Sequence, residues 1–161
     1  MPLITKADFA GVIPVTVNLP TDAANMYINQ AEKFDLATIL PTGLYDAVVT
    51  YKGNVSYPEL NALFTGYLKE LLLHQTYMRM FPQHGVNVTQ YGVRVNNEDT
   101  SNEVSSSQRA EIIRNENSII NILTAKLMAY GDAAEWTFDG TKYEFDTCNP
   151  NKPQKFKFFA L

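Results

Sequence analysis

The sequence predicts a mainly α-helical protein: a bundle of two long and two shorter helices, with two small β-hairpins and extended terminal arms. The long helices are predicted because residues 58–80 and 107–130 repeat apolar side chains at helical spacing. A hairpin is predicted because Asp139-Gly140 lies between alternating residues and suits a two-residue turn. We therefore expect an N-terminal arm over residues 1–20, a helical domain over 21–133, and a hairpin with a C-terminal arm over 134–161.

The N-terminal arm and the first short helix are predicted from the positions of prolines and helix-capping residues. Prolines exclude a long helix from the arm, in which Thr5 caps a single turn and residues 12–17 are extended. Thr21 or Asp22 then caps the first helix. Its predicted inner face holds Met26, Tyr27, Ala31 and Phe34, while Asn29, Gln30 and Glu32 lie largely outside.

The second short helix follows a predicted buried connection over residues 35–40. Thr42 is placed to cap this helix, and Lys52-Gly53-Asn54 closes it. The expected inner face consists of Leu44, Tyr45, Val48 and Val49.

The first long helix begins at Pro58, since proline is favoured at the first helical position. At 1.5 Å per residue it is ~35 Å long and must be central to the fold. A small hairpin is predicted over 86–95 because valines alternate there with other residues. The second long helix, over 107–130, is expected to end at Gly131, and its inward stripe comprises Ile112, Ile113, Ile119, Ile120, Leu123, Leu127, Met128 and Tyr130.

Composition narrows the class of protein. The chain has 161 residues, 45% hydrophobic and 19% charged, which is typical of one globular domain and excludes a disordered chain. Its net charge is -4 and no cluster of Lys and Arg is present, so tight sequence-independent DNA binding is not expected. A mildly acidic chain could nevertheless line a channel through which DNA passes.

The expected environment is reducing and non-membranous. Cys148 is the single cysteine, so an internal disulfide is excluded. The first eight residues lack the basic and then apolar order of a signal peptide, and apolar runs stay well short of the ~18 residues of a membrane span. We therefore expect a soluble protein made in the cytoplasm.

Few residues offer chemistry. His74 follows Glu70 by four residues on the central helix, but one histidine and one carboxylate make an incomplete metal site. A satisfied core histidine or a polar helix edge is the preferred interpretation of His74. The phosphate-binding, zinc-protease and serine-hydrolase motifs are absent from the sequence. We expect no catalytic residue, no metal and no cofactor.

The apolar C-terminal segment is the remaining unusual feature. Three possibilities stay open: it folds onto its own core, it docks on a neighbour, or it dangles. Chain ends normally fray, whereas large apolar side chains are concentrated here at Phe156, Phe158, Phe159 and Leu161.

Residues 22–134 resemble the helical head–tail connector (adaptor, or head-completion) proteins of tailed phages, in particular those of Bacteroidetes and crAss-like phages. Glu32-Lys33-Phe34-Asp35-Leu36 and Ile39-Leu40-Pro41-Thr42-Gly43-Leu44-Tyr45 are similar to that family's first helix and its turn. Gly92-Val93-Arg94-Val95 is similar to a short extended segment that precedes a polar loop and the last long helix. The hairpin over 134–145 and the apolar C-terminal segment depart from the family.

The resemblance implies a structural virion protein, not an enzyme. It implies a ring of about a dozen copies beneath the portal protein that receives the tail or neck proteins, at the capsid–tail junction. Double-stranded DNA would pass through the lumen without specific binding. We predict that partner contacts are made by the first hairpin and the C-terminal segment, namely by Val86, Val88, Tyr91, Val93, Val95, Phe156, Phe158, Phe159 and Leu161.

Three other classes remain open. The chain could be a different virion component: a tail-completion, stopper or internal capsid protein. It could be a helical enzyme or ligand-binding domain, which predicts a deep pocket around His74 and Glu70. A DNA-binding regulator ranks last, because Glu111 and Glu116 interrupt the basic residues of the last long helix.

Overall fold

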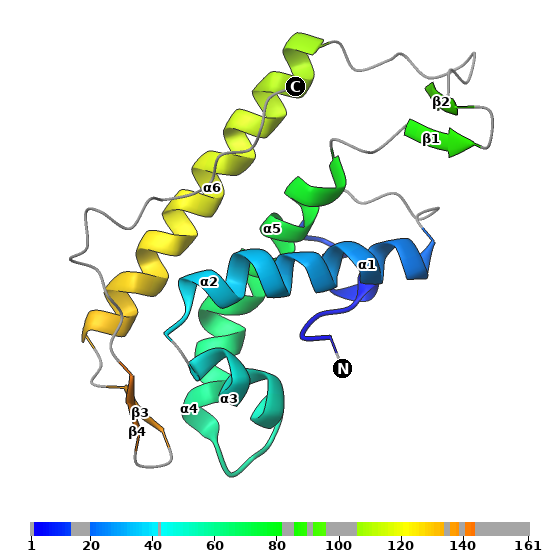
Figure 1. The fold of residues 1–161 in the computed structure, drawn as a ribbon. Coiled ribbons are helices and arrows are strands. Elements are labelled where there is room, and N and C mark those ends of the chain that lie inside the picture. The colour runs from blue at the N-terminus through cyan, green and yellow to red at the C-terminus, as the bar shows by residue number, and fades with distance from the viewer. Residues whose placement is uncertain are drawn as a thin grey trace.

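The protein is mainly helical, as predicted (Figure 1). The computed structural model describes residues 2–13, 20–41, 43–81, 86–89, 92–95, 106–133, 136–138 and 141–143. Its helices are, in order, the 3-10 turn η1 (Lys6–Phe9), α1 (Thr21–Ala31), the π-helical turn η2 (Glu32–Leu36), α2 (Ala37–Ile39), α3 (Leu44–Tyr51), α4 (Pro58–Leu63), the π-helical turn η3 (Phe64–Leu68), α5 (Lys69–Met80) and α6 (Ser106–Ala133).

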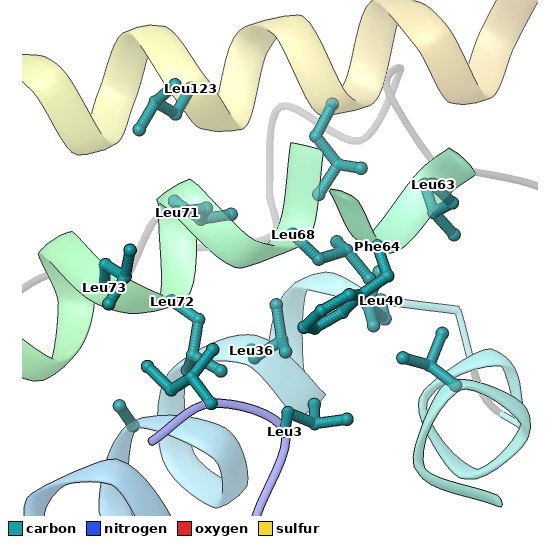
Figure 2. Packing of buried hydrophobic residues seen from close by; sticks show 14 of the residues in the cluster. Leu3, Leu36, Leu40, Leu63, Phe64, Leu68, Leu71, Leu72, Leu73 and Leu123 are labelled. Atoms are coloured by element: carbon teal, nitrogen blue, oxygen red, sulfur yellow. The ribbon is translucent and has the colours of Figure 1, made fainter. Parts of the chain in front are cut away.

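Helix α5 forms the middle of three layers. Helix α6 runs along one side of α5, and α1 crosses α5 on the other side (Figure 1). In Figure 2, Leu71 of α5 lies beneath Leu123 of α6, whereas Leu72 points toward the layer that contains Leu36 and Leu3. Since α5 is covered on both sides, most of its residues are buried, including the polar His74, Gln75 and Thr76.

The two long helices arise where the sequence predicts them. Pro58 occupies the first turn of α4, and α4, η3 and α5 follow one another without a break to Met80. The prediction that α6 ends at Gly131 is wrong, because the helix continues to Ala133. Glycine terminates a helix when it adopts a positive φ, and among the described residues only Gly11, Gly43 and Gly53 do so.

The described part of the predicted N-terminal arm belongs to the core. Thr5 and Asp8 form a capping box that starts η1, in agreement with the predicted single turn. Leu3, Ile4, Phe9 and Ile13 are all at most 5% exposed. Residues 2–13 therefore do not reach away from the molecule as an extended arm would, because these apolar side chains fill space beside α1 and α5. Residues 14–19 lie outside the described part.

Two of the described connections carry short antiparallel strand pairs. Strand β1 (Val86–Thr89) pairs with β2 (Gly92–Val95), and β3 (Trp136–Phe138) pairs with β4 (Thr141–Tyr143). The second pair follows α6 directly in sequence and lies beside the C-terminal end of that helix (Figure 1). The registers place Val86 opposite Val95 and Trp136 opposite Tyr143.

Candidate functional site

Helix α1 presents one face to the core, and the other described elements leave its opposite face uncovered. Its buried residues are Ala24, Tyr27, Ile28 and Ala31, which repeat at three- and four-residue steps and pack toward α5. Met26 does not belong to this buried stripe and is 45% exposed. The prediction that Met26 faces inward is therefore wrong.

The π-helical turn η2 changes the facing of the residues that follow α1. A π turn uses i→i+5 hydrogen bonds, so the side chains beyond it no longer continue the inward stripe of an α-helix. Phe34 is 63% exposed, although it was predicted to lie inside. Glu32 is buried, although it was predicted to lie outside. The predicted connection over 35–40 is buried at Asp35, Leu36 and Leu40, but it is helical up to Ile39.

A bidentate ion pair fixes η2 to α5. The Nε of Arg79 lies 2.6 Å from one carboxylate oxygen of Asp35, and its Nη2 lies 2.7 Å from the other. The guanidinium carbon of Arg79 also lies 5.5 Å from the centre of the Phe34 ring, within cation–π range. Phe34 is thus an exposed aromatic side chain on a turn that the Asp35–Arg79 ion pair connects to α5.

The uncovered face of α1 and η2 forms a shallow, open groove of about 490 Å³. We call it the α1 groove. One row along it, at four-residue steps, consists of Asp22, Met26, Gln30 and Phe34, and the other consists of Asn25, Asn29 and Lys33. Exposed apolar side chains framed by amides and one charge of each sign are typical of a surface that binds another protein.

A buried polar cluster lies near the start of the chain. The carboxylate of Glu32 accepts a hydrogen bond from the Leu3 amide, and the Lys52 ammonium donates to the Leu3 carbonyl. Burial raises the pKa of Glu32, although the Leu3 amide and Lys52 act in the opposite direction. Burial lowers the pKa of Lys52, which Asp8 and Glu32 partly offset. These contacts tie Leu3 to η2 and to the residue that follows α3, so the cluster has a structural explanation.

His74 is a buried histidine with a partner, as preferred from the sequence. Its Nδ1 lies 2.7 Å from a carboxylate oxygen of Glu116, which joins α5 to α6. Glu70 is exposed on α5. Within the described ranges, no three His, Cys, Asp or Glu side chains gather in a way that could hold a metal ion. None of the helices in those ranges combines the length and apolarity needed to cross a membrane.

The predicted partner contacts are only partly within the described structure. Val86, Val88, Val93 and Val95 belong to β1 and β2, whose register pairs them with one another. Tyr91 and the C-terminal residues Phe156, Phe158, Phe159 and Leu161 lie outside the described residues. The α1 groove was missed. The sequence contains a second possible inward stripe, through Ala24 and Ile28. Choosing that stripe would have placed Met26 on the outer face of the helix.

The described residues form a mainly helical protein, and the α1 groove is an open surface that contains exposed apolar side chains. The chain belongs to a family of unknown function (DUF6712), whose profile matches residues 36–144. No curated protein and no solved structure matches the chain.

Proposed function

We propose that the protein is a non-enzymatic structural subunit of a ring that joins the capsid of a tailed phage to its tail. About a dozen copies would lie beneath the portal protein, receive the tail or neck proteins, and surround the passing DNA. The ring, its position and its stoichiometry come from the resemblance of residues 22–134 to head–tail connector proteins.

The observation that carries a binding role is the exposure of Phe34 and Met26 on the α1 layer. Phe34 is 63% exposed and Met26 is 45% exposed, and both line the α1 groove, so exposed apolar surface is gathered there. Aromatic residues, Met and Arg are the types enriched where proteins bind one another. Phe34 is backed by Arg79, which is itself held by Asp35, so the exposed ring is already ordered before any partner binds.

The layered shape also supports assembly. Helix α6 covers α5 with one stripe only, and Ile122 on its other side is 53% exposed. Helices α1 and α6 lie on opposite sides of α5 (Figure 1). The α1 groove is on the side of α1 that faces away from α5, so it and the outer side of α6 face away from each other. Two different surfaces on opposite sides are what a head-to-tail ring requires.

The test is assembly with capsid components. Purified protein is mixed with tail-less capsids that carry the portal protein, and the particles are imaged by electron microscopy. We expect a ring of the protein at the portal vertex, and tail attachment that depends on it. Removal of residues 150–161 should leave the helical content unchanged and abolish tail attachment. Density for this chain inside the capsid or within the tail would assign another virion role, and normal tail joining without the protein would refute the proposal.

A further inference from the structure

We propose that the α1 groove binds residues 152–161 of a neighbouring copy of the chain. This basic segment contains Lys152, Lys155 and Lys157 together with Phe156, Phe158, Phe159 and Leu161. The inference deepens the proposed function and rests on it for the arrangement of copies in a ring. The reasons concern charge, spacing and position.

The C-terminal segment is basic, whereas the rest of the chain is acidic. Residues 147–161 hold three lysines and no acidic residue, whereas the preceding 146 residues hold all 17 acidic residues and only ten of the 13 basic ones. The body of one copy therefore attracts this segment of another at moderate ionic strength. The groove itself holds one charge of each sign, Asp22 and Lys33, so the attraction comes from the acidic body of the copy, and the exposed Asp22 carboxylate at the start of α1 can pair with one of these lysines.

The spacing of the groove suits an extended peptide. Residues four apart on a helix are separated by about 6 Å along its axis. Residues two apart in an extended segment are separated by about 6.6 Å and point the same way. Phe156 and Phe158 can therefore lie over two successive members of the first row, Gln30 and Phe34. Met26 lies eight residues from Phe34, about 12 Å along the axis.

The second row of the groove can bind the peptide backbone. The side-chain amides of Asn25 and Asn29 line the groove four residues apart. An amide can both donate and accept hydrogen bonds, and this spacing approximates the repeat of the backbone groups along one edge of an extended segment. The segment can thus place apolar side chains against the row that contains Met26 and Phe34, and its backbone against the row that contains Asn25 and Asn29.

The positions of Tyr143 and of the groove favour binding of the segment by a neighbouring copy over binding by its own chain. The last described residue before the segment is Tyr143 in β4, which lies on the α6 side of the molecule (Figure 1). The groove lies on the outer side of α1, beyond α5. In a head-to-tail ring built through these two surfaces, the α6 side of one copy would meet the α1 side of the next. The 13 residues from Tyr143 to Phe156 span up to about 45 Å when extended, enough to cross such a contact.

The test is photo-crosslinking between copies of the full chain. Benzoylphenylalanine is placed at Phe34, and this protein is mixed in equal amounts with unmodified ¹⁵N-labelled protein under conditions of ring assembly. Mass spectrometry of the crosslinked peptides then reports which copy was captured. We expect crosslinks from Phe34 to residues 152–161 of the labelled copy. The same photoreactive group at Val55, which is 91% exposed and outside the groove, should not capture that segment.

A binding measurement provides a second, independent test. A fluorescent peptide of residues 150–161 is titrated with the full-length protein, and its anisotropy is followed. The double variant Met26→Ser and Phe34→Ser should weaken binding by about tenfold or more, whereas Val55→Ser should leave it unchanged. Binding should also weaken as salt is raised, because the peptide is basic. Circular dichroism of each variant checks that the helices persist.

The outcomes separate this inference from the proposed function. Crosslinks confined to one copy, crosslinks to other residues, or no crosslinks in assembled rings would overturn the groove assignment while leaving the ring intact. Crosslinks between copies without any ring at the portal would support the groove and refute the connector role. Equal peptide binding by the groove variant and the Val55 variant would also overturn the assignment.

Discussion

Arg79 binds Asp35 through two parallel hydrogen bonds of 2.6 and 2.7 Å, and this pair joins the π-helical turn η2 to the end of α5. Asp35 is buried, and the Arg79 guanidinium is one-quarter exposed. Because both side chains are mostly buried, salt and water weaken the attraction between them less than they weaken a fully exposed ion pair. It also sets the position of Phe34 at the edge of the α1 groove.

Replacing Arg79 with lysine should destabilise the protein even though the charge is kept. Lysine is a point charge and cannot reproduce the planar fork that meets both oxygens of Asp35. We expect the free energy of unfolding in urea to fall by about 1–2 kcal/mol. The matched control is Arg114→Lys on the exposed face of α6, which should stay within about 0.5 kcal/mol of the parent. Equal effects at the two positions would show that the fork has no special role.

Glu32→Gln should change how stability depends on pH. Burial raises the pKa of Glu32 above its ordinary value of 4.5. A raised folded-state pKa contributes stability that is fully present below the unfolded pKa and is lost as pH rises through the folded pKa. The parent protein should therefore lose this contribution between about pH 4 and neutrality, whereas the glutamine variant should not. Urea unfolding across that range is the measurement, and a parent that gains stability relative to the variant would contradict it.

Asp8→Asn should have the opposite effect. Burial raises the pKa of Asp8, but hydrogen bonds from Lys69 and Thr5 outweigh burial and hold it below 3.8. A lowered folded-state pKa contributes stability that is present above the unfolded pKa and is lost as pH falls through the folded one. Removing the carboxylate should thus destabilise the protein at neutral pH and flatten its acid unfolding. Identical acid titrations of the parent and the variant, followed by circular dichroism, would exclude this role.

Thr124→Val should stabilise the protein by about 1 kcal/mol. The hydroxyl oxygen of Thr124 in α6 is buried and has no hydrogen-bond partner among the described residues, so it loses its hydration without compensation. Valine has nearly the same shape and a similar helix propensity. Thr50 is exposed in α3, so Thr50→Val makes the same exchange in a helix where the hydroxyl is hydrated, and no gain is expected. Thermal unfolding of the two variants compares them directly, and a gain at Thr50 alone would contradict the assignment.

The sequence predicted those parts of the fold in which one periodic pattern dominates. In α6, only one stripe of apolar residues can face α5, and Ile120, Leu123 and Leu127 are indeed buried. In α1, apolar residues occur on two sides, so Met26 and Ile28 are equally plausible inward residues until packing decides between them. The π turn at Phe34 could not be predicted either, since the spacing of apolar residues does not show where the hydrogen bonding changes from i→i+4 to i→i+5. The candidate site was missed for these two reasons.

A comparison of Ile28→Ala with Met26→Ala tests the facing of α1 and the availability of its outer side. Ile28 is fully buried against the core, so its truncation leaves a cavity and should cost about 2–5 kcal/mol. Met26 lies two residues away on the same helix and is 45% exposed, so its truncation should cost less than about 1 kcal/mol. Chemical denaturation of both variants gives the two free energies of unfolding. Comparable losses would mean that Met26 supports the protein's own core, and the α1 groove would then lack one of the two exposed apolar side chains on which its binding role depends. A small loss at Met26 together with a large loss at Ile28 would leave the outer row free for a partner, because the apolar surface of α1 that stabilises the monomer would then lie on the other side of the helix.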